Sequence, residues 1–461
     1  ISVNAGTLSS SGGILSLPGG ATLVSGSTFT TSNTTLNLGG SLDVADTWTS
    51  TDTSIVLTDE ASLSSTAEMS LATLDTNGYD LMLESATSDL TITEGVTINY
   101  DGEGGLNSGE ADLTLDGTVN VLYGGILSSG GTVTFGAGSN GTSFAEDTGM
   151  ELTNTSLVLQ TGLDLPYLQF SGTSSFQTNG NTLNLGVLEI GLDSELDLTD
   201  VVTGSESELL LIGNSAITKT GDLVFKEIGL NGYTLTLNTA ITSLTAESIH
   251  IPNLDEPDEP NYLASTGKLL AQGVNVTLKN PLWLKSGGIV MGGGTLTLEQ
   301  GGSLDEGGNL DLSNSILQLS GHFNNGDSQT SGLGTLTTSA STLRLNSNAK
   351  FAPASAVTFD TYEPNGWGLK LIDSTTHLTL AGNVLLQPNA ESWNSMEDSS
   401  SSSPNENNKA LDFDGTNDYV VVPHNSSLDL TNNFTIEAWV NLNSNTNNTI
   451  LDKGDYNNLF E

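Results

Sequence analysis

Short runs of alternating apolar and small polar residues follow one another along most of the chain, separated by glycine-rich corners. The pattern is clearest at 293–320, where residues 295–298, 309–312 and 316–319 read TLTL, NLDL and ILQL around the pair Gly301-Gly302. Alternation with a period of two predicts short strands with one buried face, and glycine pairs predict tight corners. Because no helical segment lies between these runs, we predict that the strands coil into a β-solenoid.

The alternating signature recurs through residues 1–390, and its spacing predicts the length of one coil. Leu157, Leu183, Leu209 and Leu235 follow one another at equal intervals. If equivalent leucines stack on one another, this interval is the length of one coil. We therefore predict an all-β, parallel β-helix with coils of roughly 20–26 residues, two or three short strands in each coil and about 17 coils.

Other intervals between copies of the signature are shorter or longer. The interval from Leu90 to Leu113 is slightly shorter, whereas the interval from Leu343 to Leu378 is much longer. The short interval fits a coil, and the long interval predicts a loop inserted into one.

The amino-acid composition suits a thin core. Hydrophobic residues make up 36% of the 461 residues and charged residues 14%, against roughly 45–50% hydrophobic residues in an average globular domain. Glycine, serine, threonine and asparagine make up the difference, so we expect one row of buried Leu, Ile or Val for each strand. Cysteine is absent, so the fold is not expected to depend on disulfides.

The charge balance is strongly acidic. The chain has 54 acidic and 10 basic residues, a formal net charge of −44, and no Lys or Arg precedes Lys219. This balance argues against nucleic-acid binding, which needs basic side chains, and against anionic membrane surfaces. No apolar stretch approaches the roughly 18 residues of a membrane span. The acidity favours a salty or calcium-rich medium, which makes calcium the candidate cofactor.

The composition and the periodicity of the sequence change after the repetitive region. Residues 391–409 are rich in Ser, Asn and acidic residues and show no periodicity, which is typical of a linker. We therefore predict a β-solenoid at 1–390, a linker at 391–409 and a different domain at 410–461.

The last segment carries a specific pattern. Residues 410–423 read ALDFDGTNDYVVVP, and SLDL at 427–430, FTIEAWV at 434–440 and ILDKG at 450–454 follow. This order resembles the opening of a laminin G-like, concanavalin A-like lectin domain. The resemblance implies a jelly-roll β-sandwich that binds carbohydrate or protein, often with calcium. Such domains run well beyond the length of this segment, so the resemblance also implies that this chain is part of a longer polypeptide.

One acidic loop is a candidate metal site. Residues 251–262 read IPNLDEPDEPNY, and their prolines predict a loop that leaves the coil. Calcium prefers oxygen ligands, and the loop offers four carboxylates: Asp255, Glu256, Asp258 and Glu259. The alternative is a solvated acidic loop, because the glycine-turned spacing of a known calcium loop is missing.

A second pair of candidate calcium ligands, Asp414 and Asp418, lies in the lectin-like segment. The alternative is that Asp414-Gly415 serves only as turn chemistry.

The sequence does not favour catalysis. It has no nucleophile or phosphate-loop motif, and no Lys, Arg or His precedes Lys219. The histidines, His250, His322, His377 and His424, lack metal-ligand spacing. We expect a protein that is not an enzyme, with a β-helix polysaccharide lyase or hydrolase as the less favoured alternative.

These observations favour an extracellular or cell-surface structural and adhesive protein: a solenoid stalk or filament subunit that carries a lectin-like domain. The pattern of short alternating runs and glycines already begins at 2–17, with no capping segment before it. Uncapped solenoid ends offer strand edges to another chain. We therefore expect self-association into oligomers or filaments. The alternative is a carbohydrate-binding scaffold of a secreted glycan-active protein.

Overall fold

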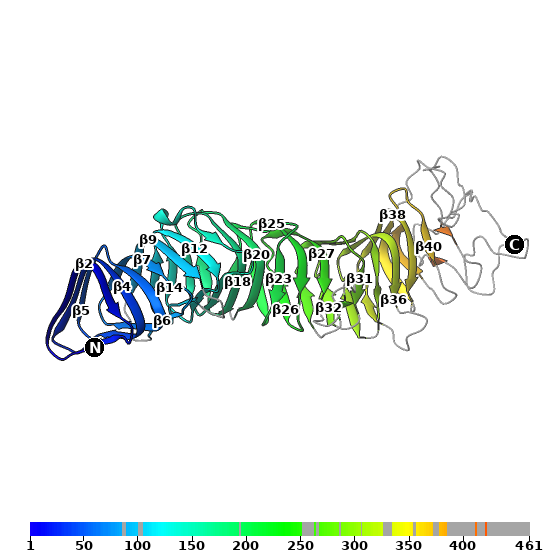
Figure 1. Cartoon of the computed structure of the whole chain (residues 1–461). Coiled ribbons are helices and arrows are strands. Elements are labelled where there is room, and N and C mark those ends of the chain that lie inside the picture. Colours follow the sequence, from blue (N-terminus) through cyan, green and yellow to red (C-terminus); the bar gives the residue numbers. More distant parts are fainter. Residues whose placement is uncertain are drawn as a thin grey trace, which may run out of the picture. The chain divides into compact units, whose positions relative to one another are not determined.

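The protein is an all-β parallel β-solenoid of about 16 turns, with 68% of its residues in strands and 1% in helices. This confirms the predicted fold class of the repetitive region. The computed structural model describes residues 1–84, 89–99, 105–192, 195–250, 262–263, 267–284, 287–305, 307–325, 334–353, 356–371, 378–384, 411–412 and 420–421. Within the solenoid, successive turns stack on one another from β2 to β40 (Figure 1).

The straight strand segments are short, and several of the longer strands consist of two such segments joined at a corner. The first strands are β1 (Ser2–Val3), β2 (Gly6–Leu17), β3 (Ala21–Leu23), β4 (Ser27–Val44), β5 (Thr47–Thr51), β6 (Ser54–Ser65), β7 (Met69–Asp75), β8 (Leu81–Leu83), β9 (Leu90–Asn99), β10 (Gly105–Asn107), β11 (Leu113–Leu115), β12 (Thr118–Tyr123), β13 (Gly125–Ser128), β14 (Thr132–Phe135), the 3-10 helix η1 (Ala137–Ser139), β15 (Ser143–Phe144) and β16 (Gly149–Thr153). They continue as β17 (Ser156–Leu159), β18 (Leu163–Gly172), β19 (Ser175–Gln177), β20 (Leu183–Leu192), β21 (Glu195–Asp197), β22 (Val201–Val202), β23 (Glu208–Leu211), β24 (Ser215–Thr218), β25 (Gly221–Gly229), β26 (Thr234–Leu237), β27 (Ile241–His250), β28 (Tyr262–Leu263), β29 (Lys268–Leu270) and β30 (Asn275–Leu278). The last described strands are β31 (Leu282–Leu284), β32 (Gly287–Val290), β33 (Thr295–Leu298), β34 (Gly301–Leu304), β35 (Gly308–Asp311), β36 (Ile316–Asn325), β37 (Thr335–Thr337), β38 (Thr342–Pro353), β39 (Val357–Glu363), β40 (Leu369–Leu371), β41 (Leu378–Val384), β42 (Leu411–Asp412) and β43 (Val420–Val421).

Each turn carries three strand segments, one on each face of the solenoid. The turn formed by β16, β17 and the start of β18 illustrates this. Each of its segments pairs in parallel with the next turn: β16 with the end of β18, β17 with β19, and the start of β18 with β20. Parallel pairing one strand spacing apart places equivalent side chains about 4.8 Å from each other.

The prediction that Leu157, Leu183 and Leu209 stack on one another is wrong. In the next turn Leu157 pairs with Phe176, and Leu183 pairs with Val201. The three leucines lie in β17, β20 and β23, on three different faces. The interval between successive leucines is therefore longer than one turn, because it spans a full turn and part of the next.

The prediction of an inserted loop between Leu343 and Leu378 is also wrong. Leu343 pairs with Tyr362 of the next turn, whereas Leu378 pairs with Val357 of the turn before it. The two leucines belong to different faces, so their separation does not measure a coil. By contrast, Leu90 pairs with Leu113 as predicted.

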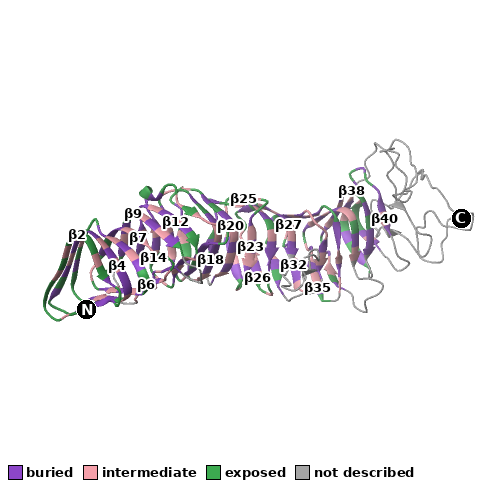
Figure 2. Ribbon diagram, viewed as in Figure 1, coloured by how far each residue is buried: buried purple, intermediate pink, exposed green. Residues whose placement is uncertain are grey.

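The core is a set of columns of inward side chains. One column runs Leu36, Ile55, Leu74, Val96 and Val119 through successive turns, and each of these residues is at most 1% exposed. Figure 2 shows the same alternation of buried and more exposed positions along the strands. Each such side chain contributes on the order of 1.5–3 kcal/mol on burial, so the narrow core is stabilised turn by turn.

Aromatic rings continue this stacking near the end of the described solenoid. Phe323 pairs with Phe351 in register, and their rings stack at 5.7 Å with an interplanar angle of 19°. Phe359, on the next strand segment along the chain, packs against Phe351 with 6.1 Å between ring centroids. All three residues are fully buried.

Asparagine side chains join neighbouring turns at several corners. Among the asparagines with left-handed backbone, four with φ between 47° and 51° are each followed by a glycine with positive φ. Asparagine is one of the few residues that tolerate this conformation. Each amide donates to the carbonyl of a leucine of the preceding turn, over 2.9 to 3.3 Å: Asn77 to Leu57, Asn179 to Leu159, Asn231 to Leu211 and Asn365 to Leu345.

The chain divides into two compact units, Ile1–Val421 and Val422–Glu461. The short strands β42 and β43 pair in parallel with β40 and β41 of the solenoid. The linker predicted at 391–409 lies outside the described residues, as does the rest of the lectin-like segment. The predicted boundary between the linker and the lectin-like segment stays a prediction.

Candidate functional site

The candidate calcium ligands of both segments lie outside the described residues. This holds for the acidic loop and for the lectin-like opening: Asp255, Glu256, Asp258, Glu259, Asp414 and Asp418. Within the described part of the chain, no group of three or more Asp, Glu or His side chains gathers around a point that could hold a metal ion.

His322 is the histidine whose surroundings the structure describes. It lies in β36, where its register partners are Gly301 of the preceding turn and Lys350 of the next. Burial lowers the pKa of His322, and the positive charge of Lys350 lowers it further. The side chain is therefore biased toward its neutral form.

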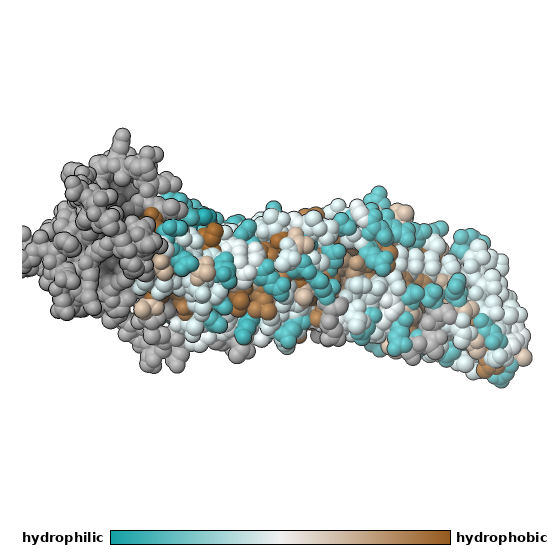
Figure 3. Space-filling model, turned by 180° about the vertical axis from the view of Figure 1, so that it is seen from behind, coloured by the Kyte–Doolittle hydropathy of each residue, from teal (hydrophilic) through white to brown (hydrophobic). Residues whose placement is uncertain are grey.

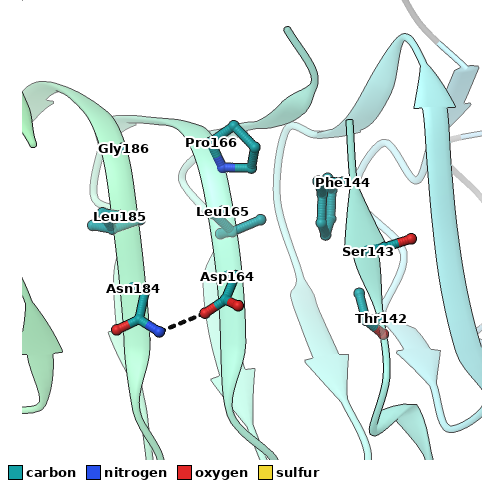
Figure 4. A pocket seen from close by; sticks show the side chains of 9 residues that line it. All are labelled: Thr142, Ser143, Phe144, Asp164, Leu165, Pro166, Asn184, Leu185 and Gly186. Carbon is teal, nitrogen blue, oxygen red and sulfur yellow. Dashed lines mark hydrogen bonds between the residues drawn. The ribbon is translucent and has the colours of Figure 1, made fainter. Parts of the chain in front are cut away.

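A shallow groove with a volume of about 390 Å³ opens on the solenoid surface between β15 and β18. Its lining comes from three successive turns: Thr142, Ser143, Phe144, Asp164, Leu165, Pro166, Asn184, Leu185 and Gly186. Figure 4 shows Phe144 on one side, across the groove from Leu165, with the Ser143 side chain pointing away from the groove and Asn184 on the next strand beside Asp164. We call this the β15–β18 groove.

The β15–β18 groove lies at an interruption of the strand ladder. β15 pairs with β12 of the preceding turn, and residues 163–165 of β18 pair with β20 of the following turn. No ladder pairing joins β15 to β18. The two turns remain connected on their other faces, where β13 pairs with β16 and β14 pairs with β17, so the interruption affects one face only.

Local sequence explains this interruption. The 3-10 helix η1 precedes β15, which extends only from Ser143 to Phe144. Pro166, which lacks a backbone N–H, follows the paired segment of β18. In the next turn Gly186 takes the place of Pro166, and a Cβ atom there would lie 2.5 Å from the Pro166 carbonyl oxygen. A larger residue at 186 would push the turns apart.

The polar groups of the β15–β18 groove are held by hydrogen bonds. Asn184 Nδ2 donates to Asp164 Oδ1, and Ser143 Oγ donates to Asn120 Oδ1 over 3.0 Å. Asp164 and Asn184 are both exposed. Phe144 is half-buried, and its ring packs against the fully buried Phe135 with 6.4 Å between centroids.

A second shallow groove, of about 350 Å³, lies near Lys219. It also marks an interrupted ladder, because β22 pairs with β20 and no pairing joins it to β25. Here side chains bridge the gap. Lys219 Nζ donates to the Val201 carbonyl, and Val224 N donates to Thr203 Oγ1 over 3.4 Å. Burial lowers the pKa of Lys219, and the charge of Asp200 partly offsets this.

Tyr167 forms a small polar cluster beside the first groove. Its hydroxyl lies 3.0 Å from Gln169 Oε1 and 3.0 Å from Glu189 Oε2, and it can donate to either. Burial raises the pKa of Tyr167, and the charge and hydrogen bond of Glu189 and the charge of Glu151 raise it further. The phenol therefore acts as a hydrogen-bond donor, not as a base.

The solenoid surface is mostly polar. Figure 3 shows one face covered mainly by residues of hydrophilic or intermediate hydropathy, with hydrophobic residues in scattered patches. Large exposed apolar side chains include Ile14 and Tyr123, which are 69% and 61% exposed.

The sequence did not reveal the groove residues, because Phe144 and Asp164 occur in segments that read as ordinary strands. The one signal in the sequence was Pro166, which lies next to an alternating run.

Comparison of the chain with models of known protein families, with curated proteins and with solved structures finds no match. In the described part of the chain, no helix is long and apolar enough to cross a membrane.

Proposed function

We propose that this chain is an extracellular structural and adhesive protein whose β-solenoid serves as a stalk or filament subunit. The observation that carries the proposal is the continuity of the stack. Even where one ladder is interrupted, as at β15 and at β22, the other strands of the same turn pair with the next turn. A solenoid in which successive turns bond to their neighbours transmits load along its axis.

The charge supports a location outside the cell. A net charge of −44 creates self-repulsion that salt or divalent cations relieve. Calcium is the proposed cofactor, with the carboxylates of the acidic loop and of the lectin-like segment as its proposed ligands. Antibody labelling of intact producing cells tests the location. Labelling without permeabilisation is expected, and labelling only after lysis would contradict the proposal.

The proposed role is not catalytic. Incubation of the full chain with neutral and acidic polysaccharides, followed by measurement of reducing ends and of unsaturated products, is expected to show no turnover. Product formation that depends on the protein would favour the polysaccharide lyase or hydrolase instead.

Self-association is part of the proposal. Exposed strand edges are templates for pairing with another chain, so a second copy is the proposed partner. Multi-angle light scattering over a range of protein concentrations is expected to show a mass that rises above 47.8 kDa. A constant monomer mass at high concentration would argue for an isolated stalk.

A second candidate function is a carbohydrate-binding scaffold of a secreted glycan-active protein. The observation that favours it is the resemblance of residues 410–461 to the opening of a lectin domain. A glycan array with the full chain tests it, since binding that is lost when residues 410–461 are removed would assign the ligand to that segment.

A further inference from the structure

The interrupted ladders at β15 and at β22 differ in how the gap is filled. At the second, the lysine at 219 and the threonine at 203 place polar atoms on the strand edges. At the β15–β18 groove, the facing side chains are Phe144 and Leu165 (Figure 4). The side chain of Ser143 is turned to Asn120. The groove therefore remains open between two turns.

The lining of the β15–β18 groove combines an apolar floor with a polar rim. Leu165 and Leu185 are 2% and 5% exposed and form its base, and the ring of Phe144 forms a flat wall held in place by Phe135. Asp164 and Asn184 stand at the rim and bond to each other. This bond leaves Asp164 Oδ2 as an acceptor, and Asn184 Oδ1 as another, toward an incoming ligand.

We propose that the β15–β18 groove binds an uncharged sugar unit. A sugar ring has apolar C–H faces that pack against an aromatic wall, and hydroxyls at its edge that donate to carboxylate and amide oxygens. The volume of about 390 Å³ is within the range of small-molecule sites, roughly 300–1,000 Å³. This site lies in the solenoid itself, apart from the lectin-like segment, and does not depend on the proposed stalk function.

Charge selects against anionic ligands at this position. Asp164 lies in the groove, Glu151 and Glu189 lie near Tyr167 in the adjoining turns, and no basic residue precedes Lys219 in the sequence. A uronic acid, sulfate or phosphate group would meet these three carboxylates, whereas Lys219, in the turns beyond Asn184, is held by the Val201 carbonyl. The groove therefore suits a neutral sugar, and its surroundings disfavour an acidic one.

The test is titration of the full chain by isothermal calorimetry, with saturation-transfer NMR as a second readout. The probes are glucose, galactose, mannose, N-acetylglucosamine, maltose and cellobiose, with glucuronate as the anionic comparison. We expect at least one neutral sugar to bind with a Kd below about 10 mM, and glucuronate to bind at least about tenfold more weakly. Failure of all six neutral probes to bind would overturn the proposal.

Variants then locate the site. Asp164→Ala removes the charged acceptor and is expected to weaken binding at least about tenfold. Phe144→Leu keeps apolar volume but removes the flat wall, and is expected to weaken binding several-fold. The matched control is Asp222→Ala, because Asp222 is also an exposed strand aspartate that accepts a hydrogen bond, from Ser243 Oγ over 2.7 Å.

Circular dichroism and thermal melting show whether each variant keeps the fold of the parent chain. If Asp164→Ala and Phe144→Leu bind as the parent does, the sugar binds elsewhere in the chain and the proposal is wrong. Equal weakening by Asp222→Ala would also overturn it, because the effect would then follow the loss of any surface charge.

Discussion

The corner asparagines allow a sharp test of how neighbouring turns are joined. Asn231 has φ 47°, and its amide donates to the carbonyl of the buried Leu211 over 2.9 Å. Asn231→Ala removes this bond, worth about 0.5–1.5 kcal/mol, and places a Cβ residue in a left-handed conformation that costs about 1–2 kcal/mol. Asn231→Gly removes the bond but adopts the conformation freely. The expected losses in stability are about 2 kcal/mol for alanine and about 1 kcal/mol for glycine.

Native-state hydrogen exchange is the suitable assay, because repeat proteins can unfold in parts and a single unfolding free energy then loses its meaning. The amides of 230–237 report opening of this turn. A loss of about 2 kcal/mol corresponds to roughly 30-fold faster exchange through local opening. Equal exchange in the alanine and glycine variants would refute the backbone argument. Exchange in the glycine variant as slow as in the parent chain would refute the role of the hydrogen bond.

Three further predictions concern the core, the histidine and the charge. Phe351→Ala is expected to destabilise its part of the solenoid by about 3–5 kcal/mol, because Phe351 is fully buried between two other rings; native-state hydrogen exchange of the amides of 349–353 measures this, and a loss below about 1 kcal/mol would contradict the stacking. Burial and Lys350 lower the pKa of His322, so on acidification the unfolded state takes up this proton first. The parent chain should therefore lose stability relative to His322→Asn as pH falls through about 6.5, with the loss complete below the folded pKa; parallel urea midpoints for the two proteins across this range would contradict it. Raising NaCl from about 20 mM to about 500 mM should raise the urea midpoint, because screening weakens repulsion within a chain of net charge −44; a midpoint that does not change with salt would show that the charges do not destabilise the fold.

The fold class was predictable because alternation reports a local property. Residues such as Thr295 to Leu298 read as a strand in the sequence and form β33 in the structure. The absence of helical segments between strands predicted parallel coiling, and the parallel register confirms it.

The register was harder to predict, because the three faces of a turn use the same alternating signature. Leu157 and Leu183 both lie in typical runs, yet Leu157 stacks on Phe176, whose segment reads SFQ. The Asn-Gly corners indicate the length of a turn better than the spacing of the leucines does. The distance along the sequence from Asn77 back to Leu57, the leucine that it contacts, is close to the length of one turn, and the equivalent asparagines repeat it.

The β15–β18 groove could not be predicted, because it arises from a missing pairing between two strands. Phe144 and Asp164 are ordinary strand residues in the sequence, and only the stacking of the turns places them across a gap. The calcium ligands expected at Asp255 to Glu259, and at Asp414 and Asp418, lie outside the described residues and stay predictions.

Electron microscopy of the purified native protein, with and without calcium chelation, tests the central claim most directly. The proposed structural function predicts extended rods or ordered filaments, with turns stacked along their length. Filaments that disperse on chelation would identify calcium-dependent assembly, and rods that persist would identify a stalk. Compact particles without an elongated solenoid, in both conditions, would contradict the account.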